Sequence, residues 1–423
     1  MSARPQLVAR RVIAPERGTE TKNQLAPVLP LAGTRVLFIV PQPFYEDRGS
    51  PIAVLQVVRA MSELGIHVDM MAFASGQSVD VKNLHIFRCG KALRIKHVPI
   101  GFSFRKVFLD FALILALRSR LKAARYTCIH ALEDGIYVAL AARVAGRIPI
   151  IYDMHSCIPE QLSTHPMFSN RLAQWILKKL ERYALRQSTV VSCSVGLKAY
   201  IKSSIPDVPV AEWTFSDPTN GTKAQKLDES ASFLRAELGI DPNARVILYA
   251  GNFKDYQGLD ILIDAFPIVR QAHPDAILVL LGASNGDNVE RLQSRGNGAL
   301  IVCPRQPHDL VENYLHMAQI LVSPRKCGEN LPLKLFEYLA AGKPIVVTDS
   351  KHHRMLLRED RAVFATSTPE GLAAAISRLL DDPAKMERLA AAAKTYSEQE
   401  LGWSNFVESV SELYKNALER PTE

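Results

Sequence analysis

The sequence predicts an α/β protein built from two doubly wound domains that face a central cleft. Short apolar segments of strand character alternate with amphipathic segments of helical period through residues 35–205, and the alternation starts again at residue 246 and runs to about residue 380. Such alternation is typical of a Rossmann-like parallel sheet with helices on both faces. The length of 423 residues is enough for two domains of ordinary size.

Changes in composition divide the chain into segments. The tail carries scattered charges and prolines without a period. The linker combines several prolines with an Asn-Gly pair, and we predict one short helix in it, near residues 230–238. The last segment is a helix with no strand after it. The predicted segments are an N-terminal mobile tail (1–33), a first Rossmann-like domain (34–205), a linker (206–244), a second Rossmann-like domain (245–400) and a C-terminal helix (401–423).

The individual elements follow from local periodicity and from turn residues. In the first domain we predict strands at 35–40, 67–73, 84–87, 127–130, 148–152 and 189–192, with helices at 52–64, 104–124, 135–145, 170–186 and 195–203. In the second domain we predict strands at 246–250, 276–281, 300–303, 320–322, 345–347 and 362–364, followed by helices at 384–395 and 404–418.

Composition excludes several classes of protein. No apolar run approaches the ~20 residues of a membrane span, and no secretory signal opens the chain. The six cysteines form no CxxC pair, so they indicate buried thiols in a reducing compartment rather than a zinc site. We therefore expect no bound metal.

Residues 320–348 are predicted to form a strand, a polar loop, a helix and a second strand. Asn330 is expected to cap the helix, whose N-terminus attracts phosphate. Glu329 precedes the helix, and Glu337 lies roughly 7–8 Å further along its axis than Pro332. Carboxylates accept paired hydrogen bonds from sugar hydroxyls, so the arrangement suits a sugar joined to a nucleoside through a diphosphate. The alternative is an ordinary helix with one exposed and one structural glutamate.

The Glu329-x7-Glu337 spacing, followed by Ala-Gly-Lys-Pro at 341–344, resembles the E-x7-E motif of family-4-type retaining glycosyltransferases with the GT-B fold. The resemblance implies that Glu329 faces the transferred sugar as a catalytic residue and that Glu337 binds the nucleotide ribose. The glycines that often follow the family's first glutamate are replaced here. We expect their replacements, Asn330 and Leu331, to contact the donor.

The segment from Tyr249 to Leu262 departs from the family at the donor diphosphate. Relatives usually carry an arginine after the first glycine, Gly251, and a lysine before the next one. Those positions are Asn252 and Gln257 here. A diphosphate needs cationic partners, so we expect Lys254 and Arg325 to supply the charge, with Lys326 and Lys334 as further candidates. In the first domain, Gly49 and Ser50 match a glycine-rich loop that approaches the same diphosphate.

Two segments of the first domain end in polar residues at the expected edge of the cleft. His155 matches a family histidine and is predicted to be catalytic, although it could also be a satisfied polar residue at a strand end. Related enzymes often have a histidine where this chain has Leu132. The adjacent Glu133 and Asp134 are predicted to bind acceptor hydroxyls.

The resemblance implies a retaining, metal-independent hexosyltransferase. It also implies that the first domain (34–205) holds the acceptor, that the second (245–400) binds the nucleotide sugar, and that the C-terminal helix (401–423) crosses back onto the first domain. The enzyme would take a UDP- or GDP-sugar as co-substrate, need no other cofactor, and act on a glycan or lipid-linked acceptor in cell-envelope or exopolysaccharide synthesis. The leaving phosphate helps to deprotonate the acceptor in this family. A nucleotide-sugar epimerase or hydrolase on the same fold, and a GT-B protein that binds nucleotide sugar without turnover, remain alternatives.

Charge is distributed unevenly. Residues 35–205 hold 23 lysines and arginines against 11 acidic residues, an excess of +12, whereas the whole chain has a net charge of only +8. The excess is concentrated in residues 91–125 and 171–202, where cations alternate with bulky apolar residues. This pattern predicts contact with an anionic membrane, on the inner face of the plasma membrane, by an otherwise cytoplasmic protein. A solvated helix face is the alternative, and no motif indicates nucleic acid.

Overall fold

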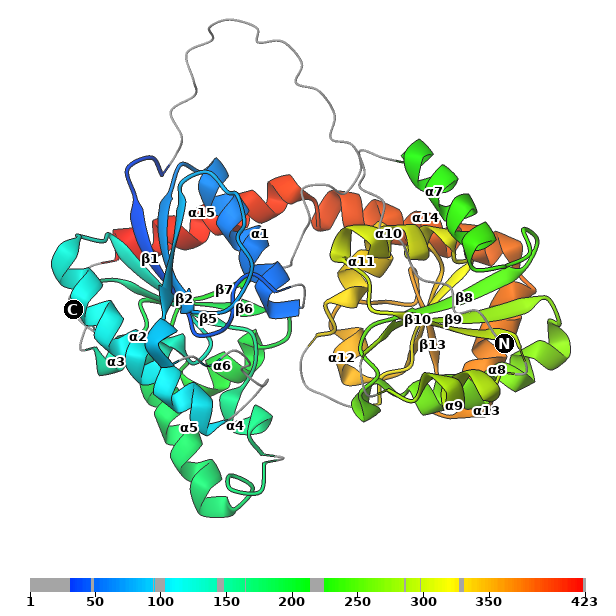
Figure 1. Cartoon of the computed structure of the whole chain (residues 1–423), viewed down its shortest axis with the longest axis horizontal. Coiled ribbons are helices and arrows are strands. Elements are labelled where there is room, and N and C mark those ends of the chain that lie inside the picture. The colour runs from blue at the N-terminus through cyan, green and yellow to red at the C-terminus, as the bar shows by residue number, and fades with distance from the viewer. Residues whose placement is uncertain are drawn as a thin grey trace, which may run out of the picture.

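The computed structural model describes residues 31–46, 49–93, 95, 103–142, 148–163, 165–213, 224–284, 287–296, 298–326 and 331–420. The predicted N-terminal tail lies outside these ranges apart from residues 31–33. The described residues form two separate parallel sheets with helices packed on their faces, as the alternating pattern predicts (Figure 1).

The first sheet has seven strands in the order β3-β2-β1-β4-β5-β6-β7, and every adjacent pair is parallel. Its strands are buried over most of their length, which explains why they appear in the sequence as continuous apolar runs. They are β1 (Arg35–Val40), β2 (His67–Phe73), β3 (Leu84–Cys89), β4 (Cys128–Leu132), β5 (Ile150–Met154), β6 (Val190–Ser194) and β7 (Val210–Trp213).

The helices of this half cover both faces of the sheet. One face packs against α1, and the other packs against α2, α3, α5 and α6. No described helix is both long and apolar enough to cross a membrane. The helices are α1 (Gly49–Glu63), α2 (Phe104–Ala123), α3 (Gly135–Ala141), α4 (Ile158–Gln161), α5 (Arg171–Arg186) and α6 (Lys198–Ser204), with a 3-10 turn at Lys91–Leu93.

The second sheet has six parallel strands in the order β10-β9-β8-β11-β12-β13. The strands are β8 (Arg245–Ala250), β9 (Ala276–Ala283), β10 (Leu300–Pro304), β11 (Ile320–Ser323), β12 (Ile345–Thr348) and β13 (Val363–Ala365). Around them lie α7 (Ala224–Glu237), a 3-10 turn at Asp255–Gln257, α8 (Leu259–Ala272), α9 (Val289–Ser294), α10 (His308–Met317), α11 (Lys334–Ala340), α12 (Lys351–Arg354), α13 (Pro369–Leu380) and α14 (Pro383–Glu400).

The last helix, α15 (Trp403–Glu419), returns from the second sheet to the first, where it packs against α1, β6 and β7 (Figure 1). The indole nitrogen of Trp403 donates to the Glu63 carboxylate on α1 at 2.9 Å. The hydroxyl of Tyr414 lies 2.6 Å from Nδ1 of His130 in the first core. These buried and half-buried contacts hold the C-terminal helix on the first sheet.

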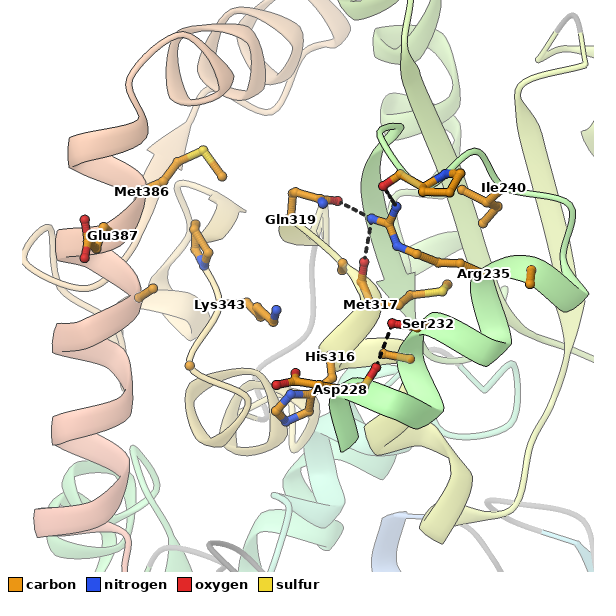
Figure 2. Close-up of a pocket in the computed structure, with 17 residues that line it drawn as sticks. Asp228, Ser232, Arg235, Ile240, His316, Met317, Gln319, Lys343, Met386 and Glu387 are labelled. Carbon is orange, nitrogen blue, oxygen red and sulfur yellow. Dashed lines mark hydrogen bonds between the residues drawn. The ribbon is translucent and has the colours of Figure 1, made fainter. Parts of the chain in front are cut away.

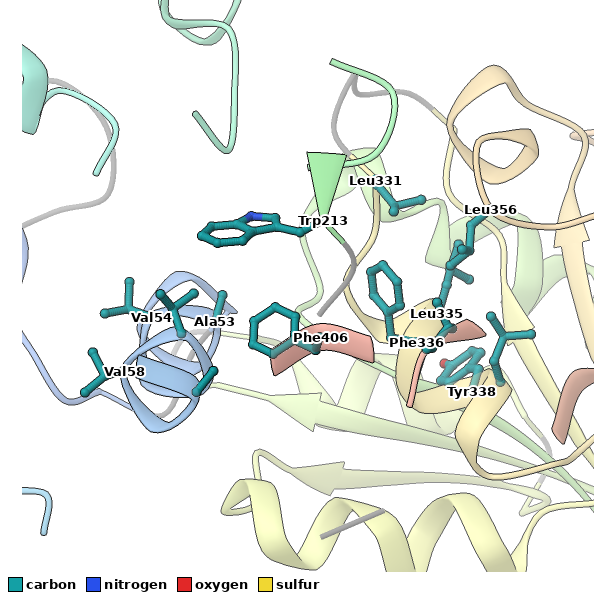
Figure 3. Packing of buried hydrophobic residues seen from close by; sticks show 14 of the residues in the cluster. Ala53, Val54, Val58, Trp213, Leu331, Leu335, Phe336, Tyr338, Leu356 and Phe406 are labelled. Carbon is teal, nitrogen blue, oxygen red and sulfur yellow. The ribbon is translucent and has the colours of Figure 1, made fainter. Parts of the chain in front are cut away.

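One hydrophobic cluster spans both halves. It includes Val54 of α1, Trp213 of β7, Phe406 of α15, and Leu331 and Phe336 of the second half (Figure 3). Burial of apolar surface is the main favourable term in such packing. The cluster therefore stabilises the arrangement of the two sheets as well as each sheet alone.

Several predicted boundaries differ from the structure, and three of the differences affect the argument. The predicted linker (206–244) contains β7, an unpredicted edge strand of the first sheet, and α7, which confirms the short helix predicted near residues 230–238 but begins earlier. The predicted helix at 135–145 ends at Ala141 within the described residues. A further difference concerns α11, which begins at Lys334 with Leu333 in the capping position, so the predicted Asn330 cap is wrong. The N–H groups of Leu335 and Phe336 bond three residues back, which makes a tight turn before the regular helix starts.

Candidate functional site

The candidate site lies outside the carboxyl ends of the central strands. In each sheet the winding reverses between two neighbouring strands, β1 and β4 in the first and β8 and β11 in the second. Ligands of doubly wound sheets bind at this point. Gly251 follows β8, and Arg325 lies just after β11. A Cβ placed on Gly49 of the first half would lie 3.6 Å from Leu333 of the second, so loops of the two halves approach each other here.

Lys334 brings a cation to the reversal point of the second sheet. Its Nζ atom lies 3.1 Å from Oε1 of Gln257 and 3.9 Å from the centre of the Tyr249 ring. A Cβ on Gly251 would lie only 2.5 Å from the same nitrogen. Because glycine has no Cβ, the ammonium group can lie directly beside the backbone of this turn.

Arg325 is a second cation at this edge, and it is buried. Its guanidinium lies over the Tyr256 ring, 5.3 Å from the ring centre, and its backbone carbonyl accepts a 2.7 Å hydrogen bond from the Thr348 hydroxyl. Burial and the charge of Arg325 together lower the pKa of Lys334 to about 7, against the opposing effect of Glu337. An anion bound here would favour the charged form of Lys334.

The remaining predicted donor residues of this loop occupy different environments. Gln257 is buried and touches Lys334, whereas Asn252 is exposed and donates from its side-chain nitrogen to the Tyr256 hydroxyl at 3.1 Å. Lys254 is exposed, and its backbone N–H bonds the Asn252 side chain at 3.2 Å. The structure thus brings Lys334, rather than Lys254, next to Gly251 and Gln257.

Glu337 lies three residues after Lys334, so both are on one side of α11. Its Oε1 atom is 3.6 Å from Nδ1 of His308 at the start of α10. The hydroxyl of Tyr338 accepts the backbone N–H of Ala250 at 2.9 Å, which ties α11 to the end of β8. Leu331 is buried in the cluster between the halves.

Two residues predicted at the same place, Glu329 and Asn330, lie outside the described residues.

The first half contributes a group of ionisable residues, of which Asp153 is buried and Glu133 and His155 are half-buried. Glu133 has a left-handed backbone with φ of 49°, and both of its carboxylate oxygens accept from the Ser156 hydroxyl at 3.1 Å. Burial raises the pKa of Glu133 to about 7, although the charge of His155 opposes this. Nε2 of His155 lies 3.2 Å from Oδ2 of Asp153. The predicted His155 and Glu133 are therefore brought together at the ends of β4 and β5.

Asp153 is the residue of this group that sequence reasoning missed. It is fully buried and accepts from the Ser192 hydroxyl at 3.0 Å. Burial alone would raise its pKa, but the charge of His155 and the ring of His130, whose Nε2 lies 3.4 Å from Oδ2, outweigh burial and hold the pKa well below its usual range. For His155, burial lowers the pKa and the charge of Asp153 raises it more. The sequence did contain a signal for Asp153, because a carboxylate interrupts the apolar strand two residues before His155.

The other predicted residues of the first half have local partners. Asp134 forms an ion pair with Lys106 of α2, which also lies 3.1 Å from Asp110. Ser50 accepts from the Gln42 side chain at 3.1 Å at the start of α1.

A cavity of about 790 Å³ lies at the amino ends of the strands of the second sheet, between α7, α10 and α14 (Figure 2). Arg235 donates to the Gln319 side chain at 3.0 Å and to the carbonyl of Met317 at 3.1 Å within it. Gln319 precedes β11 and Pro344 precedes β12, whereas the candidate site follows these strands. The cavity is therefore separate from the site.

Two family models match the chain. "Glycosyl transferases group 1" matches residues 230–396 and "Glycosyltransferase Family 4" matches residues 48–211. The chain belongs to the family-4-type glycosyltransferases with the GT-B fold. One match lies in each half of the molecule, so the family assignment extends to both halves of this glycosyltransferase.

Individual proteins agree with this assignment at low identity. The phosphatidyl-myo-inositol mannosyltransferase of Mycobacterium leprae is 24% identical over 388 residues, which are 90% of this chain and 96% of that protein. The structure of sucrose-phosphate synthase from Thermosynechococcus elongatus matches with a TM-score of 0.72 at 18% identity. The match covers 90% of this chain and 98% of that protein. Anabaena HepE, solved with UDP-glucose, has a TM-score of 0.67 at 17% identity, with 90% and 99% covered.

Proposed function

We propose that this glycosyltransferase moves a hexose-type sugar from a UDP- or GDP-sugar to a glycan or lipid-linked acceptor, with retention of anomeric configuration and without a metal ion. The product would belong to cell-envelope or exopolysaccharide synthesis. We propose a cytoplasmic location, because the cysteines of the described residues have free thiols and are buried, as is usual in a reducing compartment.

The pair of cations beside Gly251 is the observation that carries the proposal. Lys334 and Arg325 lie at the reversal point of the second sheet, and Lys334 rests on Gln257 and Tyr249. Their charges can neutralise a diphosphate directly, so the binding of this group requires no metal. Glu337, one turn along the same helix, has carboxylate oxygens that can accept from ribose hydroxyls. A neighbour of the same fold, Anabaena HepE, was solved with UDP-glucose, which supports a nucleotide-sugar donor.

The chemistry follows from this charge distribution. Departure of the sugar leaves negative charge on the diphosphate, and the two cations stabilise that charge as it develops. The acceptor hydroxyl loses its proton to the departing phosphate oxygen, so no separate base is needed. Attack then occurs on the face that the diphosphate leaves, which retains the configuration. The residual role of the protein is to hold donor and acceptor in position.

The cluster around Asp153 supports an acceptor site in the first half. His155 is held by Asp153 in a form that favours positive charge, and Glu133 lies beside it. We propose that His155 donates to a hydroxyl of the transferred sugar and that Glu133 accepts from the acceptor. A lipid-linked acceptor is supported by the mannosyltransferase relative, which acts on a phosphatidylinositol.

Product analysis separates the proposal from its alternatives. The purified protein is incubated with UDP- and GDP-hexoses, with and without glycan and lipid-linked acceptors, and the products are followed by NMR. We expect nucleoside diphosphate release that depends on the acceptor and a product with the donor's anomeric configuration. Release into water alone would indicate a hydrolase, and a changed sugar still bound to nucleotide would indicate an epimerase. Donor binding without any turnover would indicate a non-catalytic protein.

A further inference from the structure

Helix α2 presents an apolar stripe to solvent. Phe104, Phe108 and Phe111 are 71%, 64% and 60% exposed, and Leu115 continues the row. The spacing of four, three and four residues places them on one side of the helix. The opposite side of α2 packs into the core of the first sheet through Leu109, Leu113 and Leu117. The exposed stripe is thus additional to the stripe that the fold itself requires.

Helix α5 also presents a row of apolar side chains to solvent. Leu172, Ile176, Leu180 and Tyr183 form an exposed row at the same kind of spacing, and Trp175 beside them is 59% exposed. Monomeric soluble proteins rarely leave contiguous apolar patches of this kind uncovered, and such patches mark interaction sites.

Helices α2 and α5 lie on the same face of the first sheet. Their buried sides contribute to one core on the same face of the first sheet, and α3 lies between them and contacts both (Figure 1). Each connection to the next strand places the first turn of α2 and of α5 at the carboxyl edge of the sheet, the edge that faces the site. We call the exposed side chains of these two helices the α2–α5 face.

The charges on the α2–α5 face are predominantly positive. On α5 five cations are exposed, and the one acidic residue, Glu181, is buried, where it accepts from the Tyr200 hydroxyl and from the Ile158 N–H at 3.0 Å. The five cations are Arg171, Lys178, Lys179, Arg182 and Arg186.

On α2 two neighbouring cations point in different directions. Lys106 turns inward to Asp110 and Asp134, whereas Arg105 is exposed near the three phenylalanines. Exposed cations beside exposed Phe, Trp and Tyr are the composition of helices that lie in a membrane interface.

We propose that the α2–α5 face docks on an anionic membrane leaflet. The cations would contact lipid headgroups, and the aromatic side chains would enter the boundary between headgroups and acyl chains. The orientation brings the carboxyl edge of the first sheet, and with it the cleft, to the lipid surface. The inference goes beyond the proposed transfer reaction and does not depend on it, since docking is measured without a donor and with an inactive cleft as well as an active one.

Co-sedimentation with vesicles tests the proposal. The full chain is mixed with vesicles of phosphatidylcholine alone or of an equal mixture with phosphatidylglycerol, at 0.1 M and 1 M salt. We expect binding to the mixed vesicles only, weakened at 1 M salt, where the Debye length falls from about 10 Å to about 3 Å. A salt-resistant remainder should disappear in Phe104→Ser/Phe108→Ser.

Charge variants supply the matched comparison. Lys178→Glu/Arg182→Glu should lower the partition coefficient at least about 25-fold, because each cation near an anionic surface contributes about fivefold. Arg378→Glu/Arg388→Glu, exposed on the second half, should leave it unchanged.

Circular dichroism melting of each variant confirms that it is folded.

Three results would overturn the inference. These are binding that ignores lipid charge, equal loss in both charge variants, and no binding by the wild-type chain. A second copy of this chain is the alternative partner for the α2–α5 face. If sedimentation velocity shows a dimer that Trp175→Ser dissociates, and vesicles do not bind, the face is an interface between copies and the membrane proposal is wrong.

Discussion

The ammonium nitrogen of Lys334 lies 3.1 Å from the side-chain oxygen of Gln257. The family resemblance implies a lysine at residue 257 itself. In this protein an uncharged side chain occupies that position, and a cation from α11, 77 residues later, reaches the same place. A lysine from a different element of the same sheet edge therefore lies at this position, and Gly251, which has no Cβ, leaves room for it.

Replacement of Lys334 should weaken binding of the donor diphosphate. A hydrogen bond to a charged group contributes about 1.5–3 kcal/mol, so Lys334→Met should raise the Kd for UDP or GDP by about 10- to 100-fold. Binding of the free nucleoside should change much less, because it lacks the phosphates. Isothermal titration calorimetry measures both. Lys254→Met is the matched control from the neighbouring loop. If that variant loses as much affinity as Lys334→Met, the exposed loop lysine also reaches the phosphates.

The same lysine should make diphosphate binding depend on pH. Burial lowers the pKa of Lys334 to about 7, so above pH 7 the amine is mostly neutral in the free protein. A bound diphosphate favours the ammonium form, so binding takes up a proton and affinity should fall as pH rises from 7 to 9. Calorimetry in buffers of different ionisation enthalpy detects that proton. Lys334→Arg keeps its charge throughout this range and should flatten the profile. A wild-type affinity that is constant across the range would show that Lys334 stays charged or does not contact phosphate.

The two glutamates of the motif should separate binding from turnover. Glu337→Ala should weaken donor binding, since the ribose hydroxyls would lose a charged acceptor whose contribution is about 1.5–3 kcal/mol. Glu329→Ala should mainly lower kcat, because the resemblance places this residue at the transferred sugar. Steady-state kinetics with direct donor titration distinguishes the two effects. Wild-type activity in both variants would exclude this assignment.

Glu133 should impose a pH dependence on stability. Burial raises the pKa of this carboxyl from 4.5 to about 7 in the folded state. The stability it contributes is fully present below pH 4.5 and is lost as pH rises through about 7, where the buried carboxyl must ionise. Glu133→Gln cannot ionise and can still accept from Ser156. The Tm of the variant relative to wild type should therefore increase from pH 5 to pH 8 in thermal unfolding. A Tm difference that does not change with pH would mean that Glu133 is ionised at little cost.

Much of the fold was predictable because buried parallel strands are continuous apolar runs. Segments such as RVLFIV at 35–40 and ILVS at 320–323 can be recognised as strands from the local sequence, without knowledge of their neighbours in the sheet. Strand β7 was missed because VAEW at 210–213 is an edge strand, exposed on one side and surrounded by prolines. The start of α11 was misplaced because a proline is compatible with both a first helical turn and a preceding tight turn.

The sequence by itself determined the two alternating units, the family resemblance around Glu337, and the loss of the usual cations at Asn252 and Gln257. Only the tertiary structure decided which lysine lies beside Gln257 and Gly251. Long side chains can point in many directions, and the anchoring of Tyr338 on β8 aims Lys334 at Gly251 while Lys254 stays in solvent. The same reason separates Arg105 from Lys106. Neighbours in a helix differ by about 100° in direction, so one faces solvent and the other a half-buried carboxylate.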